Sequence, residues 1–142
     1  LREDALDYVA GYTLCNDYAI RDFLENYYRP NLRVKNRHST TPVGPYIIDK
    51  SLVPAPNNLV LKTWVNGELR QEGTTADMIF DVPFLIEYIS SFMTLQPGDM
   101  IATGTPEGLS DVVPGDEVVV EIEGVGKLRN FIVSESDFFK AV

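Results

Sequence analysis

The sequence has few of the residue types that reactive sites usually use. It holds one cysteine, Cys15, and one histidine, His38, among 142 residues. A single cysteine cannot form an internal disulfide, so we expect a cytoplasmic protein in which Cys15 is a small core residue. A lone histidine excludes a histidine-paired zinc site, and no G-x-S-x-G segment supports a serine hydrolase that uses His38. The sequence also lacks a CxxC pair, a phosphate-binding loop and a dinucleotide fingerprint.

Positive charge and long apolar runs are scarce as well. Twelve basic residues face 21 acidic ones, which gives a net charge of −9. Such an acidic chain repels nucleic acid and anionic membranes, so neither is expected as a partner. No apolar run approaches the roughly 20 residues of a membrane-spanning helix. From the length of the chain and its opening residues, LREDALDYVAGY, we expect residues 1–142 to be a single domain that lacks its N-terminal portion.

Turn signals and apolar runs predict mostly antiparallel strands. The clearest signal is Asn66-Gly67 between two alternating segments, which is typical of a type I′ hairpin because both turn residues need positive φ. The expected strands are residues 9–16, 46–48, 59–65, 69–73, 100–104 and 117–124, with a returning strand after 124–126. This pattern predicts an α+β fold, a mostly antiparallel β-sandwich or roll with a few short helices.

The expected helices are few. Residues 2–9 are expected to form one or two turns, and residues 18–27 a helix that Pro30 ends. Another helix is expected after Asp81, with Pro83 in its first turn, where a missing N–H does no harm. The apolar stripe of this helix is expected to be core, and it consists of Leu85, Ile89 and Phe92 or Met93. The sequence predicts a loop over residues 31–45 and a fraying polar tail over residues 134–142.

Positive charge concentrates in residues 21–38. Five basic residues against two acidic ones give this segment a local charge of +3. The basic residues are Arg21, Arg29, Arg33, Lys35 and Arg37. A focused cationic strip in an acidic chain suggests a site for a small anion. The alternative is that the strip pairs with acidic neighbours elsewhere in the protein or at a subunit contact.

Three local patterns carry possible chemistry. Asp17 and Arg21 are four residues apart, on one face of the expected helix, although the pattern alone favours Asp17 as the cap of that helix. Lys35 stands among arginines, whose positive charges favour its neutral form. Gly104-Thr105-Pro106 is a bend where backbone N–H groups and a hydroxyl can meet an anion.

A Glu-x-Glu pair, Glu121 and Glu123, is a further candidate for cation binding. At strand spacing the two carboxylates point to the same face, as a shared cation requires. Their alternation with the apolar residues of the strand instead favours a solvent-exposed face, and we prefer that interpretation.

Several longer segments resemble the fumarylacetoacetate hydrolase family in their order along the chain. They are CNDYAIRD, VKNR with TTPVGPYI, VNGELRQ, MTLQPGDMIATGTPEGLSD and PGDEVVVEIEGVGKL, and they cover nearly all of the chain. The resemblance implies a divalent cation, Mg²⁺ or Mn²⁺, held by a Glu-x-Glu pair and by the aspartate of the ND motif. On this chain that aspartate is Asp17. The Glu-x-Glu pair is expected upstream of Leu1, and not at Glu121 and Glu123.

The resemblance also implies roles for other residues. Lys35 corresponds to the family's catalytic lysine, although its flanking residues, VKNR, differ from the usual segment. Arg21 of the IRD motif is expected to bind a substrate carboxylate, as are Gly104 and Thr105 of the TGTP turn. Leu24 stands where many relatives have a glutamine, which argues against hydrolase activity.

The function implied by the resemblance is metal-dependent decarboxylation and isomerisation of an unsaturated 2-oxo or 2-hydroxy dicarboxylic acid, through an enolate, in aromatic (4-hydroxyphenylacetate or homoprotocatechuate) catabolism. The expected partner is a small 2-oxo di- or tricarboxylate, and the expected assembly is a homodimer. One alternative is a non-catalytic half-domain that serves as a structural or dimerisation scaffold. The other is a related C–C hydrolase of the acylpyruvase type. Without the glutamates, the 142-residue piece alone is expected to be inactive.

Overall fold

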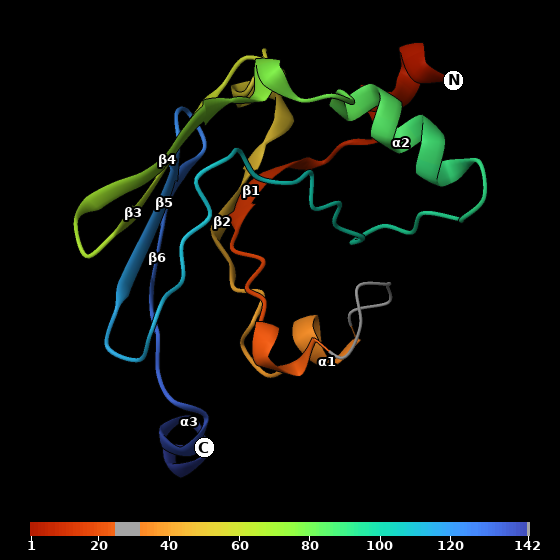
Figure 1. Ribbon diagram of the computed structural model, residues 1–142. Coiled ribbons are helices and arrows are strands. Elements are labelled where there is room, and N and C mark those ends of the chain that lie inside the picture. The colour runs from red at the N-terminus through yellow and green to blue at the C-terminus, as the bar shows by residue number, and fades with distance from the viewer. Residues whose placement is uncertain (25–31, 142) are drawn as a thin grey trace.

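The strands of the protein form two antiparallel sheets that lie side by side (Figure 1). The computed structural model describes residues 1–24 and 32–141. The smaller sheet pairs β1 (Gly11–Cys15) with β2 (Val43–Asp49). The larger sheet has the order β4-β3-β5-β6 and consists of β3 (Val60–Val65), β4 (Glu68–Thr74), β5 (Glu117–Ile122) and β6 (Gly126–Phe131). With short helices around these sheets, the predicted α+β class is confirmed.

The helices are short and lie at the two ends of the sheets. The longest, α2 (Val82–Ser90), lies at one end, and α1 (Leu32–Lys35) and α3 (Glu135–Ala141) lie at the other (Figure 1). The 3₁₀ segments are η1 (Arg2–Tyr8), η2 (Arg21–Phe23), η3 (Lys50–Leu52) and η4 (Thr75–Asp77). Within the described residues, no helix has the length and apolar character needed to cross a membrane.

The hairpin that joins β3 to β4 has the predicted turn. Asn66 has a φ of 52° and Gly67 a φ of 80°, as a type I′ turn requires. The Asn66 amide nitrogen donates to the carboxylate of Asp116 at 2.7 Å, and its oxygen accepts from the backbone N–H of Glu117 at 2.9 Å. The turn residue therefore also fixes the start of β5.

The start of α2 also agrees with the sequence. Asp81 is the N-cap, and its carboxylate accepts from the backbone N–H of Phe84 at 2.8 Å. The guanidinium of Arg2 binds both oxygens of the same carboxylate at 2.9 Å. The Phe84 N–H and then Arg2 hold the pKa of Asp81 below its usual value. One carboxylate thus joins the first residues of the chain to α2.

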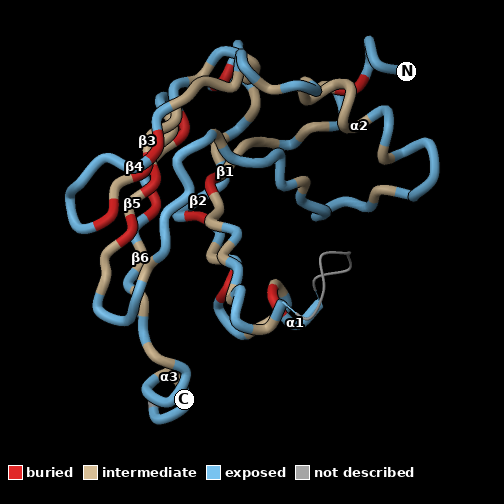
Figure 2. Tube along the Cα trace, in the orientation of Figure 1, coloured by how far each residue is buried: buried red, intermediate tan, exposed pale blue. Residues whose placement is uncertain are grey.

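The core lies between the two sheets. Its buried side chains are Leu14, Val53, Val120, Val125 and Leu128. In Figure 2, burial follows the strands, and α2 carries no buried residue. The expectation that the apolar stripe of α2 is core is therefore wrong within this structure. Phe92 and Met93 are 64% and 55% exposed. Aromatic rings contact one another in a row from Phe80 to Phe92, stacked up to Tyr88 and edge-to-face between Tyr88 and Phe92.

The helix predicted over residues 18–27 does not form in its described part. Residues 18–20 are irregular, and only the short segment η2 follows, while residues 25–27 lie outside the described residues. The backbone N–H of Tyr18 donates to Thr40 at 2.9 Å, and that of Ile20 donates to Val34 at 3.1 Å. These amides bond across to a neighbouring segment, and Ile20 there has a ψ of 88°, which lies outside the helical region.

Two other local predictions are wrong. Residues 100–104 form no strand, because this segment joins no backbone ladder within the described residues. The tail forms α3 instead of fraying. Its first turn is capped by Ser134, whose hydroxyl accepts from the backbone N–H of Asp137 at 3.1 Å and donates to the Asp137 carboxylate at 2.7 Å. The S-x-x-D spacing was the signal for this helix.

Candidate functional site

A broad open depression, which we call the basin, lies beside the two sheets. Its volume is about 2180 Å³, larger than the 300–1,000 Å³ usual for small-molecule sites, so two residues that line the basin need not lie close together. All five residues proposed from the sequence line it: Asp17, Arg21, Lys35, Gly104 and Thr105. The fold therefore places residues 17–35 and 104–105 along one basin, while their chemical roles stay predictions.

Asp17 and Lys35 form an ion pair in the basin. The Lys35 Nζ lies 2.7 Å from Asp17 Oδ2 and also donates to the Asp17 backbone oxygen at 3.2 Å. The Asp17 side chain is 53% exposed and that of Lys35 31%, so both remain accessible. Asp17 does not cap a helix, because η2 begins after Ile20 without a side-chain cap. The cap interpretation is therefore wrong, and no helical face joins Asp17 to Arg21.

The position of Lys35 depends on buried neighbours. Val34 is 3% exposed and anchors α1, while its carbonyl accepts from Ile20. The Thr40 hydroxyl is within hydrogen-bond distance of the Lys35 carbonyl at 2.7 Å and of the Arg37 carbonyl at 2.9 Å. These contacts replace the predicted loop with an ordered turn of helix that directs Lys35 toward Asp17.

Residues of the cationic strip pair with acidic and aromatic neighbours and also line the basin. Arg37 pairs with Glu135 and lies over the Phe23 ring at 4.4 Å, where Arg33 also lies at 5.3 Å. His38 packs against Phe138 and Phe139 of α3. These residues therefore agree with the alternative interpretation, in which the strip pairs with acidic neighbours elsewhere in the protein. Arg29 lies outside the described residues. Arg21 and Lys35 line the basin, and Arg37 and His38 line it as well.

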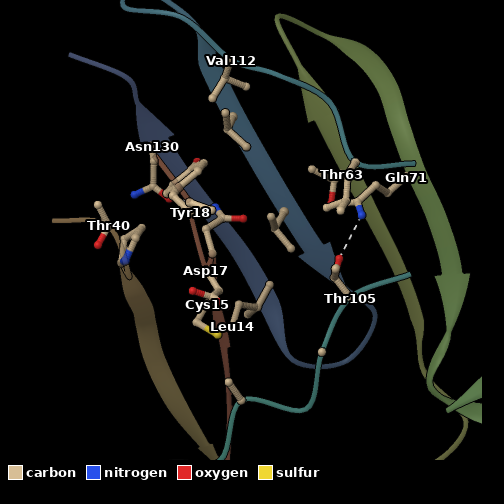
Figure 3. A pocket seen from close by; sticks show the side chains of 18 of the residues that line it. Leu14, Cys15, Asp17, Tyr18, Thr40, Thr63, Gln71, Thr105, Val112 and Asn130 are labelled. Atoms are coloured by element: carbon tan, nitrogen blue, oxygen red, sulfur yellow. Dashed lines mark hydrogen bonds between the residues drawn. The ribbon is translucent and has the colours of Figure 1, made fainter. Parts of the chain in front are cut away.

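The TGTP turn reaches the basin from the opposite side. Gly104 has a φ of 101°, a value that favours glycine, and Thr105 is exposed to the basin. The Gln71 amide donates to the Thr105 hydroxyl at 2.9 Å and to the Pro106 carbonyl at 2.8 Å (Figure 3). Sequence reasoning missed Gln71, because β4 consists mostly of polar residues and nothing in its sequence marks Gln71 as the buried one.

The Cys15 thiol and the Tyr18 hydroxyl are shielded from solvent and belong to residues close to Asp17 in the chain. Burial, followed by the negative charge of Asp17, raises the pKa of the Cys15 thiol, as expected of a half-buried structural cysteine. Burial raises the pKa of Tyr18 to about 12. Its hydroxyl has no hydrogen-bond partner among the described residues, and Figure 3 shows the ring beside Asn130. No motif or spacing indicated a role for either Tyr18 or Asn130.

Asp17 fits a hard divalent cation as one ligand. Its carboxylate is accessible and faces the basin, and oxygen is the donor that Mg²⁺ and Mn²⁺ prefer. In the part of the chain that the structure describes, no three His, Cys, Asp or Glu side chains gather in a metal-binding group. Glu121 pairs with Lys127 at 3.0 Å, and Glu123 is exposed, in agreement with the preferred solvent-facing interpretation.

The comparisons with known sequences agree on one family. The family model for the fumarylacetoacetate hydrolase C-terminal domain matches residues 1–133. The 4-hydroxyphenylacetate degradation bifunctional isomerase/decarboxylase of Salmonella dublin is 75% identical over 132 residues, which cover 93% of this chain and 31% of that protein. The homoprotocatechuate catabolism bifunctional isomerase/decarboxylase of Escherichia coli is 74% identical over 132 residues, 93% of this chain and 30% of that protein. The chain thus spans about a third of the length of these relatives.

Solved structures share the fold. The fumarylpyruvate hydrolase of Pseudomonas aeruginosa, in complex with Mn²⁺ and pyruvate, matches with a TM-score of 0.89 and 33% identity over 95% of this chain and 59% of that chain. The 2-hydroxyhepta-2,4-diene-1,7-dioate isomerase of Mycobacterium marinum matches with a TM-score of 0.85 and 39% identity over 94% of this chain and 52% of that chain.

Proposed function

Since the chain belongs to the fumarylacetoacetate hydrolase family, we propose that it is the catalytic-type domain of a divalent-metal-dependent decarboxylase and isomerase. The substrate is an unsaturated 2-oxo or 2-hydroxy di- or tricarboxylic acid of 4-hydroxyphenylacetate or homoprotocatechuate catabolism. High identity to two bifunctional enzymes of that catabolism supports this substrate class. The observation that carries the proposal is the Asp17–Lys35 pair, 2.7 Å apart, in one basin with Thr105.

Asp17 supplies one metal ligand in this proposal. Mg²⁺ and Mn²⁺ need about six oxygen donors, so the other protein ligands come from a Glu-x-Glu pair outside residues 1–142. When bound, the cation acts as a Lewis acid that withdraws electrons from the keto group of the substrate. Asp17 also orients Lys35 through their ion pair, which sets the direction of the ammonium group.

Lys35 handles charge and protons. Loss of CO₂ leaves an electron pair on the substrate, and the charged Nζ of Lys35 stabilises the developing negative oxygen through a hydrogen bond. In its neutral form the same nitrogen takes a proton from one carbon of the conjugated substrate and returns that proton to another carbon. Proton transfer without loss of CO₂ is isomerisation, so one lysine serves both reactions.

Arg21 and the TGTP turn bind the carboxylates of the substrate. The guanidinium of Arg21 offers two parallel N–H donors, which match the two oxygens of a carboxylate. Across the basin, Thr105 offers a hydroxyl, and Gly104 allows the backbone to approach the ligand closely because it lacks a side chain. Two binding points of this kind suit a dicarboxylate, since they fix both ends of the molecule.

The complete protein that contains this chain tests the proposal. We propose that this complete protein is a cytoplasmic homodimer. In the assay, CO₂ release from a 2-oxo-hex-3-ene tricarboxylate is measured with added Mg²⁺ or Mn²⁺. The expected result is turnover that a chelator abolishes and added metal restores. Turnover that is equal with and without the chelator contradicts the metal-dependent mechanism, and no turnover at any metal concentration contradicts the proposed substrate.

A further inference from the structure

We propose that Gln71 is a positioning residue that fixes the Thr105 hydroxyl as a hydrogen-bond donor toward a bound carboxylate. The inference rests on the proposed function, because it assumes that Thr105 meets the substrate. Gln71 lies in β4, and its side chain reaches from the sheet into the TGTP turn (Figure 3). Gln71 itself contacts no substrate in this proposal and acts through Thr105.

The two contacts of the Gln71 amide determine its orientation. A carbonyl oxygen can only accept, so the Gln71 atom that lies 2.8 Å from the Pro106 oxygen must be the NH₂ group. The same nitrogen lies 2.9 Å from the Thr105 hydroxyl oxygen. That nitrogen has no lone pair to offer, so the Thr105 oxygen accepts this bond. The hydroxyl hydrogen of Thr105 is therefore directed elsewhere.

The free direction of that hydrogen is the basin. Thr105 is exposed and lines the basin, whereas Gln71 is only 9% exposed. A hydroxyl whose oxygen already accepts a hydrogen bond is polarised to donate, and a carboxylate can only accept. The geometry thus prepares Thr105 for an anion before the anion binds, which lowers the cost of ordering the site.

The backbone of β4 holds the same turn closely. A Cβ atom added to Gly73 would lie 2.7 Å from Pro106 Cβ, and one added to Gly108 would overlap the carbonyl oxygen of Arg70. Both distances are shorter than real Cβ contacts, so each glycine permits an approach that a side chain would block. Gln71 lies between these two close contacts. The turn and the residues after it therefore contact β4 at Gly73, Gln71 and Arg70. Of these three contacts, the one from Gln71 reaches the Thr105 hydroxyl.

A double-mutant cycle for pyruvate binding tests the role of Gln71 in the complete protein. Pyruvate affinity is measured by calorimetry with saturating Mn²⁺ for the unmodified protein, Gln71→Met, Thr105→Val and the double variant. Gln71→Met keeps the length of the side chain and removes its donor. We expect about 5-fold to 10-fold weaker binding for Gln71→Met alone, and less than 2-fold further weakening when Thr105→Val is already present. Equal losses in both backgrounds would show a merely structural role and overturn the proposal.

Two further variants sharpen the test. Gln71→Glu has the same shape but only accepts, so it draws the Thr105 hydrogen away from the ligand and is expected to weaken pyruvate binding more than Gln71→Met does. It also serves if Gln71→Met fails to fold. Glu72→Gln is the matched control, because Glu72 is exposed and pairs with Lys62 at 2.9 Å. The control is expected to leave pyruvate affinity unchanged.

The outcomes separate this inference from the proposed function. Protein that binds pyruvate but releases no CO₂ from the tricarboxylate contradicts the proposed reaction, and the binding cycle still decides the role of Gln71. Gln71→Glu that binds pyruvate as tightly as the unmodified protein overturns the role of Gln71, whatever the turnover. Unmodified protein that binds no pyruvate also overturns it, since the carboxylate contact would then be missing.

Discussion

The Nζ atom of Lys35 lies 2.7 Å from the carboxylate of Asp17 and 3.2 Å from the backbone oxygen of the same residue. The pair joins the end of α1 to the irregular segment after β1. Because neither side chain is buried, an incoming cation can reach the carboxylate and an incoming acid can reach the amine. The pair therefore connects the proposed metal ligand, Asp17, to the proposed proton-transfer residue, Lys35.

Replacement of Asp17 tests its proposed role as a metal ligand. In the complete protein, Asp17→Ala is expected to weaken Mn²⁺ binding by at least about 10-fold, because one of few charged oxygen donors is lost. Electron paramagnetic resonance of free Mn²⁺ measures the affinity. Asp22→Ala is the control, since Asp22 also lines the basin but has no proposed role. Unchanged Mn²⁺ affinity in Asp17→Ala would refute the metal site.

Replacement of Lys35 separates chemistry from binding. Lys35→Met keeps an unbranched side chain but cannot transfer a proton, so kcat is expected to fall by about 10²–10⁴-fold. The KM is expected to change much less, because Arg21 and Thr105 still bind the carboxylates. Steady-state kinetics at saturating Mn²⁺ measures both constants. Lys62→Met is the control, because Lys62 pairs with Glu72 and has no proposed role in the reaction. A kcat within 3-fold of the unmodified value contradicts the role of Lys35.

Local features of the fold were predictable because their causes lie within a few residues. Asn66-Gly67 predicted its turn, and Asp81 with Pro83 predicted the start of α2. The helix over residues 18–27 was wrong because this segment lies against a partner 14 or more residues away, where Ile20 has a non-helical ψ of 88°. Apolar spacing carries no information about such a partner, so it could not exclude the helix.

Two glycines with the same backbone conformation allow a test of how the TGTP turn is seated. Gly98 has a φ of 99° with open space around it, and Gly108 has a φ of 98° against the Arg70 carbonyl. Gly98→Ala is expected to cost about 1–2 kcal/mol of unfolding free energy, from backbone strain alone. Gly108→Ala is expected to cost at least about 2 kcal/mol more, since the turn must also move. Denaturant unfolding measures both, and equal losses contradict the close seating on β4.

Tyr18 provides a test in alkaline solution. Burial raises its pKa to about 12, so its ultraviolet absorbance change is expected well above the usual value of 10. The folded pKa lies above the unfolded one, so the stabilisation is complete below pH 10 and is lost as the pH rises toward about 12. Spectrophotometric titration measures this step, and Tyr18→Phe is expected to remove it. A titration curve that is the same in Tyr18→Phe at high pH contradicts the burial of Tyr18.

The site was more predictable in its residues than in its geometry. The motifs around Asp17, Arg21, Lys35 and Thr105 indicated which residues to consider, and the fold brings them to one basin. Asp17 and Arg21 were expected to lie close together on one face of a helix. That reason was wrong, since no helix joins Asp17 to Arg21. Gln71 was missed because its partner is 34 residues away, on a segment that was expected to follow a strand.

The position of β4 at the margin of the larger sheet affects how long the turn stays ordered. Within the described strands, β4 bonds to β3 on one side only, and outer strands separate from a sheet more readily than central ones. Each brief separation of β4 near Gln71 also releases the TGTP turn, without unfolding of the core around Leu14. The lifetime of a captured acid is therefore linked to local opening of one strand, and hydrogen exchange in the turn should keep pace with exchange in β4.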